Sequence, residues 1–256
     1  MRKVLLLVAT AAFALCTCVD AMAAGSGADE LHVLASNASK PAIVEIVPMF
    51  EQATGTRVHV EYANNPIVKQ QVEAGAEFDV VLIEPQMLTA LAKAGRVKTG
   101  SMVPLAMIGM ALVARAGAAP VDIGTLEAFK RVLLAADSIA YTADGHSGEV
   151  FLQTLDRLGI RAAMTPKLVP VTGRLSTLTV AEGGAQYTAF PLAGDVPGVQ
   201  SVGAFPEEIQ TYIGISAAIG ANVAAPEAAR AWLAYLQSDA ARALFVAKGY
   251  RLPPAR

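Results

Sequence analysis

Hydrophobic and polar residues follow two kinds of periodic pattern along the chain. Short apolar runs are typical of strands, whereas longer segments with apolar residues three and four positions apart are typical of helices. Strand-like and helix-like segments alternate along the chain, which indicates an α/β protein with mainly parallel sheets. Strands are predicted at 31–34, 58–62, 79–83, 107–114, 138–141, 168–171, 187–190, 199–202 and 213–219. Helices are predicted at 41–54, 66–74, 86–94, 126–135, 149–158, 175–181, 226–236 and 239–248.

The start of the chain does not follow either of these periodic patterns. Arg2 and Lys3 precede an apolar stretch, 4–15, and small residues flank a potential cleavage point in 21–23. This is the pattern of a secretory signal peptide, so residues 1–23 are excluded from the fold. No later apolar run reaches the roughly 18 residues that a membrane span needs. We therefore expect a periplasmic protein.

Both cysteines of the chain, Cys16 and Cys18, lie inside this signal. The mature chain then has no disulfide, no thiolate metal ligand and no cysteine nucleophile. A lipoprotein is the alternative, with one of these cysteines carrying the lipid. Leu15 and Thr17, which precede them, are not the small residues expected before a lipidated cysteine, so an unlipidated protein is favoured.

Composition narrows the class of protein. Apolar residues make up 54% of the 256 residues and charged residues 16%, enough for a large core in one large or two modest domains. The formal net charge is −2 and the charges are scattered without a basic stripe. This distribution argues against nucleic acid as a partner.

Small polar residues gather at four junctions where a predicted strand leads into a helix. Free backbone N–H groups at a helix N-terminus suit an anion, and strand ends in open α/β sheets meet at a shared crevice. Each junction by itself could be an ordinary helix cap or turn. Because there are four of them, a shared ligand site is favoured. The junctions are Ser36-Asn37, Asn64-Asn65, Asp144–Gly148 and Thr172–Arg174.

Catalytic and metal chemistry have weaker support. Asp144, His146 and Ser147 are nearly adjacent, and such neighbours rarely form a catalytic triad. The G-x-S-x-G nucleophile motif is absent from the sequence. The other histidines, His32 and His59, lie in predicted strands without a ligand spacing. We expect no enzymatic activity, no metal and no cofactor.

Several segments resemble the substrate-binding proteins of molybdate-type ABC transporters, in the type II periplasmic binding protein group. They are Phe50–Val58 (FEQATGTRV), Gln71–Val81 (QVEAGAEFDVV), Pro206–Gln210 and the tail 226–250. The resemblance implies two α/β lobes joined by two crossovers, with a hinge and a ligand cleft between them. Residues 29–115 and 204–256 would form lobe 1, and residues 116–203 would form lobe 2.

The resemblance also implies a ligand and its contacts. The family typically holds a tetrahedral oxyanion through Ser hydroxyls and backbone N–H groups, without a counter-charge. Two departures from the family are the Asn pair in the second loop, where Ser is usual, and Thr188–Leu192, where a Tyr is usual. The resemblance favours a molybdate-like oxyanion, and because of these two departures tungstate, sulfate, phosphate or a small organic anion are the alternatives. The implied ligand-binding residues are Ser36, Asn37, Asn64, Asn65, His146, Ser147, Gly173 and Tyr187.

Two functions follow from the resemblance. The first is a monomeric periplasmic receptor that delivers a small anion to an inner-membrane ABC permease. The second is a sensing protein that presents a small organic anion to a membrane signalling partner.

Overall fold

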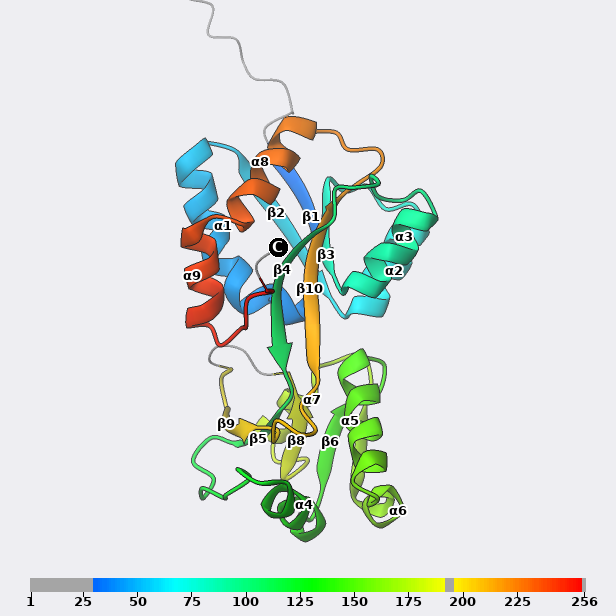
Figure 1. The fold of residues 1–256 in the computed structure, drawn as a ribbon, viewed down its shortest axis with the longest axis vertical. Coiled ribbons are helices and arrows are strands. Elements are labelled where there is room, and N and C mark those ends of the chain that lie inside the picture. The colour runs from blue at the N-terminus through cyan, green and yellow to red at the C-terminus, as the bar shows by residue number, and fades with distance from the viewer. Residues whose placement is uncertain (1–29, 192–195, 255–256) are drawn as a thin grey trace, which may run out of the picture.

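The computed structural model describes residues 30–191 and 196–254, so the predicted signal peptide lies outside the described residues. Two five-stranded sheets are arranged one above the other along the long axis (Figure 1). The first sheet has the order β2 (Arg57–Ala63), β1 (Glu30–Ser36), β3 (Val80–Ile83), β10 (Tyr212–Ile219) and β4 (Val103–Gly109). The second has the order β7 (Leu168–Val171), β6 (Ile139–Thr142), β8 (Tyr187–Phe190), β5 (Ala111–Arg115) and β9 (Val199–Ala204). The predicted α/β fold with two lobes is confirmed, and we call these parts the first and second lobe.

Both sheets mix parallel and antiparallel strands. In the first sheet β1 pairs in parallel with β2 and β3, and β10 pairs antiparallel with β3 and β4. In the second sheet β6 pairs in parallel with β7 and β8, and β5 pairs antiparallel with β8 and β9. The parallel strands of each sheet therefore end at a common edge, but half of the strand pairings are antiparallel, so the prediction of mainly parallel sheets is wrong.

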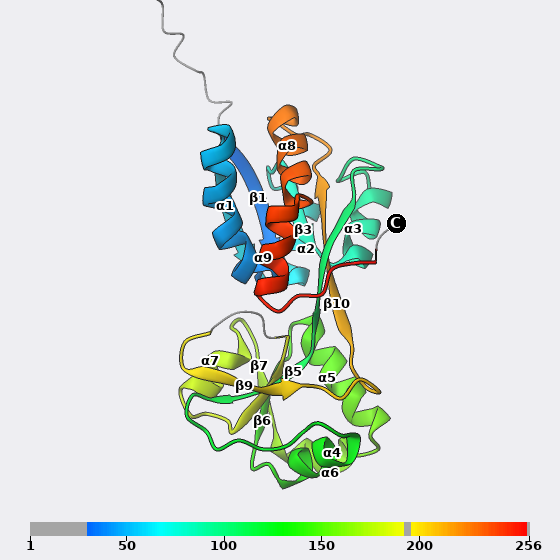
Figure 2. The same cartoon turned by 60° about the vertical axis from the view of Figure 1, so that its left-hand side comes forward.

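Alternating side chains let helices cover both faces of the first sheet. On β1, Leu31 and Val33 join the core that contains Trp232, whereas Leu34 joins the core on the opposite face. Helices α1 (Lys40–Thr54), α8 (Pro226–Leu236) and α9 (Asp239–Ala247) cover the first of these faces (Figures 1 and 2). Helices α2 (Asn65–Glu73) and α3 (Pro85–Lys93) cover the second.

The second lobe holds α4 (Leu126–Ala135), α5 (His146–Arg157), α7 (Ser176–Ala181) and a short helix, α6 (Arg161–Met164), that the sequence analysis missed. Gly148 lets α5 approach β6 very closely. A Cβ atom at Gly148 would lie 2.1 Å from the carbonyl oxygen of Thr142, which no side chain tolerates. This contact fixes the start of α5 against the end of β6.

One predicted strand, 107–114, is two strands in the structure. β4 ends at Gly109 and β5 begins at Ala111, and the two belong to different sheets. An unbroken apolar run does not reveal such a change, because both strands are buried. Since 111–115 pairs with β8 and β9, we propose that the lobe boundary lies near Met110 rather than after Arg115.

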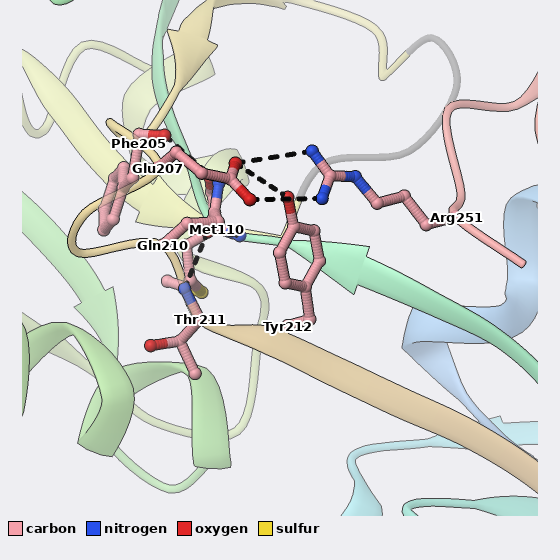
Figure 3. Close-up of polar contacts among 7 residues, drawn as sticks. All are labelled: Met110, Phe205, Glu207, Gln210, Thr211, Tyr212 and Arg251. Atoms are coloured by element: carbon pink, nitrogen blue, oxygen red, sulfur yellow. Dashed lines mark hydrogen bonds and ion pairs between the residues drawn. The ribbon is translucent and has the colours of Figure 1, made fainter. Parts of the chain in front are cut away.

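The two crossovers between the lobes are held together by side chains (Figure 3). The Gln210 Oε1 atom accepts from the backbone N–H of Met110 at 2.8 Å, and its Nε2 atom donates to the Met110 carbonyl at 3.0 Å. Nearby, the Arg251 guanidinium lies 4.3 Å from the centre of the Tyr212 ring and pairs with Glu207 at 3.3 Å. The Gln210 amide and the Arg251–Glu207 ion pair thus have their partners within the chain.

Across residues 30–191 and 196–254, no helix has the length and apolar character needed to cross a membrane.

Candidate functional site

A cavity lies between the two lobes, at the ends of the parallel strands. Its volume is about 50 Å³. Six of the eight residues predicted from the sequence line it. They are Ser36, Asn37, Asn64 and Asn65 from the first lobe, with His146 and Ser147 from the second.

Ser36 occupies the last position of β1 and is 1% exposed. Although it precedes the helical turn Asn37–Ser39, its side chain makes no capping hydrogen bond. Its Oγ atom is buried without a hydrogen-bond partner among the described residues. A buried hydroxyl without a partner is costly, so a donor at this position fits a ligand better than it fits a helix cap.

The Asn residues connect the first two junctions. Asn37 Nδ2 donates to Asn64 Oδ1 at 3.1 Å, which brings the ends of β1 and β2 together. Asn64 precedes α2 but does not cap it through its side chain. Asn65 Nδ2 instead donates to the Oε1 atom of Glu84 at 2.7 Å.

The second lobe supplies the opposite wall. His146 and Ser147 form the first turn of α5, behind Gly145, which has no side chain to cap it. Behind this turn, Thr142 donates to Ser176 at 3.2 Å, and Ser176 shares a 2.7 Å hydrogen bond with Thr188. This wall therefore presents free backbone N–H groups backed by a satisfied polar layer.

Glu84 is the site residue that the sequence analysis missed. It follows β3 directly, lines the cavity and is 4% exposed. Its Oε2 atom lies 3.7 Å from His146 Nε2 on the opposite wall. Burial raises the pKa of the Glu84 carboxyl, while the His146 charge and the Asn65 hydrogen bond act in the opposite direction. A charged residue between an apolar strand and Pro85 was the signal that could have identified it.

The remaining predicted residues lie away from the cavity wall. Gly173 donates its backbone N–H to Asp144 Oδ2 at 2.8 Å. Tyr187 is buried in β8, where it pairs with Ala114. Arg174 pairs with Glu182 at 2.7 Å, away from the lining residues.

A second cavity, of about 530 Å³, lies at the opposite end of β1 and β3. It is larger, but its main polar groups are already partnered. Asp79 accepts from the backbone N–H groups of His32, Ala224 and Ala225, and Arg96 donates to the Glu73 carbonyl at 3.0 Å. We therefore assign the functional site by its unpartnered donors rather than by size.

The cavity between the lobes combines neutral donors with one acidic side chain. Helices α1, α2, α3, α5 and α7 begin at or beside it, and none of them has a side-chain cap at its start. Among the described residues that line it there is no Lys or Arg. Such a site suits an anion held by hydrogen bonds rather than by opposite charge. The fold and the cavity are those of a two-lobed solute-binding protein.

Comparison with known proteins agrees with this class. Residues 31–251 match the family described as bacterial extracellular solute-binding protein, and the chain belongs to that family. A Pseudomonas sp. protein named aconitate isomerase is 32% identical over 223 residues, which cover 84% of this chain and 85% of that protein.

Solved structures share the fold. The periplasmic molybdate-binding protein of Azotobacter vinelandii has a TM-score of 0.75 at 19% identity, over 88% of this chain and 100% of that one. The sulfate-binding protein SubI of Mycobacterium tuberculosis has a TM-score of 0.69 at 17% identity, over 87% and 86% of the two chains. At these identities the similarity establishes the fold alone.

Proposed function

We propose that this protein binds a small organic carboxylate in the cavity between its lobes. The observation that carries the proposal is the mixed lining of the cavity. Unpartnered donors such as Ser36 Oγ face the same space as the buried Glu84 carboxyl and the apolar side chains of Leu175, Phe190 and Ile213.

This lining favours an organic anion over molybdate. A tetrahedral oxyanion carries an acceptor oxygen on every side, so one oxygen has to face Glu84, which repels it when ionised. In an organic carboxylate the charged and apolar parts lie at different places in the molecule. Its carboxylates can accept from the donors while its carbon skeleton contacts Glu84 and the apolar wall. The similarity to a protein named aconitate isomerase supports the same ligand class, with aconitate as the first candidate.

The size of the cavity sets a condition on entry. About 50 Å³ holds roughly four water molecules, less than a tricarboxylate needs. A ligand of that size enters when the lobes separate about the two crossovers, a hinge motion of the kind expected for two-lobed receptors. Separation of the lobes changes the volume of the cavity but not the residues that line it. We therefore infer the ligand class from the lining residues rather than from the volume.

Delivery to an inner-membrane ABC permease from the periplasm is the role that the family and the predicted signal peptide favour. The receptor would act as a monomer. A sensing role uses the same cavity and differs in the membrane partner. Permease and ATPase genes beside the coding gene support transport, and a sensor kinase gene supports signalling.

Calorimetry with the mature chain tests the ligand. The panel contains cis- and trans-aconitate, citrate, molybdate, tungstate, sulfate and phosphate. We expect heat of binding from at least one carboxylate and weaker or no binding of molybdate. Tight binding of molybdate without any carboxylate would reject the organic ligand and restore the oxyanion prediction. Binding of nothing in the panel would reject the cavity as an anion site.

A further inference from the structure

We propose that Glu84 is a proton-transfer base that removes a proton from a carbon next to a carboxylate of the bound ligand and returns it to the ligand. This inference rests on the proposed function, because it requires an organic carboxylate in the cavity. It changes the role of the site, since a receptor of this kind would interconvert double-bond isomers of an unsaturated carboxylate as well as hold it.

The geometry of Glu84 separates its two oxygens. Oε1 is held by Asn65 Nδ2 at 2.7 Å, whereas Oε2 has no hydrogen bond to any residue in 30–191 or 196–254. Oε2 lies 3.7 Å from His146 Nε2, too far for a hydrogen bond, so it is available to a ligand atom. One oxygen therefore anchors the carboxylate and the other is left to react.

The surroundings favour proton transfer. Burial raises the pKa of Glu84, which makes its ionised form a stronger base than an exposed carboxylate. The charged and polar groups that face it are Asn65 on α2 and His146 and Glu149 on α5, and His146 Nδ1 lies 3.3 Å from Glu149. Ser36 and the start of α5 line the same cavity as Glu84, so their donors can stabilise negative charge that develops on the ligand.

The step balances without a redox partner. The C–H bond of a methylene group beside a carboxylate breaks, and the proton moves to Glu84 Oε2. The electron pair left on carbon spreads over the allylic carbons and into the ligand carboxylates. Glu84 then gives the proton to the far allylic carbon, where a new C–H bond forms and the double bond is displaced. The carboxylate of Glu84 is restored.

The test uses trans-aconitate in D₂O with the mature protein, followed by proton NMR. We expect loss of the methylene signal and formation of an isomer. Glu84→Gln should slow both by about 100-fold or more, while calorimetry shows binding within about threefold of wild type. Glu84→Asp should recover part of the rate. Glu77→Gln, on the exposed surface away from this cavity, should keep the wild-type rate.

The pH profile distinguishes a base from a structural residue. The exchange rate should fall as pH drops through the pKa of Glu84, with a midpoint above the ordinary value of 4.5. Exchange by Glu84→Gln at the wild-type rate would overturn the inference, and so would trans-aconitate binding to wild type without exchange. Failure of wild type to bind any carboxylate would overturn the proposed function and this inference with it.

Discussion

Apart from the four-residue α6, which has no side-chain cap, the helices that begin away from the cavity differ from those that begin at it in how their first N–H groups are satisfied. Away from the cavity, Thr125 caps α4 by accepting from Ala128 N, and Ser238 caps α9 by accepting from Ala241 N. At the start of α8, the Asp79 carboxylate accepts a hydrogen bond from the backbone N–H of Ala225. At the cavity, Ser36 and Asn64 stand in positions where such caps are common, yet neither side chain caps.

This difference separates two uses of the same residue types. A capping Ser accepts a hydrogen bond from a backbone N–H group in the first turn of its own helix and so stabilises that helix. An uncapped helix start beside a buried, unpartnered hydroxyl leaves several hydrogen-bond donors facing the same cavity. These unsatisfied donors lower the stability of the unliganded protein, and a bound anion offsets that cost. The residue type at a strand–helix junction is therefore ambiguous between a helix cap and a ligand donor, and the hydrogen-bond partners of the side chain decide between the two.

The largest expected effect comes from moving one of these helix starts. In Gly148→Ala the new Cβ meets the Thr142 carbonyl, so α5 has to move away from β6. Overpacking of this kind costs about 1–3 kcal/mol, which lowers Tm by roughly 2–12 °C in a chain of this size. The donors of α5 move with the helix, so ligand affinity should fall at least about tenfold.

Gly124→Ala is the matched control for this variant. A Cβ atom there meets only the Asp122 side chain at 3.2 Å. Thermal melts and calorimetry should show little change for Gly124→Ala. If Gly148→Ala bound the ligand as wild type does, the start of α5 would not be part of the site.

A pair of serine variants tests the comparison directly. Ser36→Ala should weaken ligand binding by roughly 1–3 kcal/mol, about 5- to 150-fold in Kd, with little loss of stability because its hydroxyl has no partner to lose. Ser238→Ala should do the reverse, lowering the free energy of unfolding by about 1 kcal/mol with unchanged affinity. Calorimetry and urea unfolding measure the two quantities. Equal effects of the two variants on binding would remove the distinction between the two kinds of helix start.

The smallest expected effect is on stability against pH. Because burial raises the pKa of Glu84 in the folded protein, the fold favours its protonated form, and stability falls as pH rises from 4.5 through the raised pKa. Glu84→Gln should therefore have a higher Tm than wild type by a few degrees at pH 8, and the gain should vanish near pH 4. Glu77→Gln should show no such pH-dependent gain. A gain for Glu84→Gln that stays constant with pH would contradict the assigned cause.

Much of the fold could be predicted from sequence because its signals are local. The periodic helices and the apolar strands near Leu31 and Val80 appear in the structure with small shifts at their ends. The split at Met110 could not, since pairing of strands in separate sheets is a long-range property. Ser36 was predicted at the site, but whether its hydroxyl was a cap or a free donor depended on contacts across the chain. Glu84 was missed for the same reason, because its role depends on His146 from the other lobe.

A crystal structure of the mature protein with trans-aconitate would show whether the cavity between the lobes holds an organic carboxylate. We expect a ligand carboxylate within about 3.2 Å of Ser36 Oγ, with carbon atoms facing Glu84 and the start of α5 closing the opposite side. Ligand bound only in the larger cavity beside Arg96, with the space between the lobes unchanged, would contradict it.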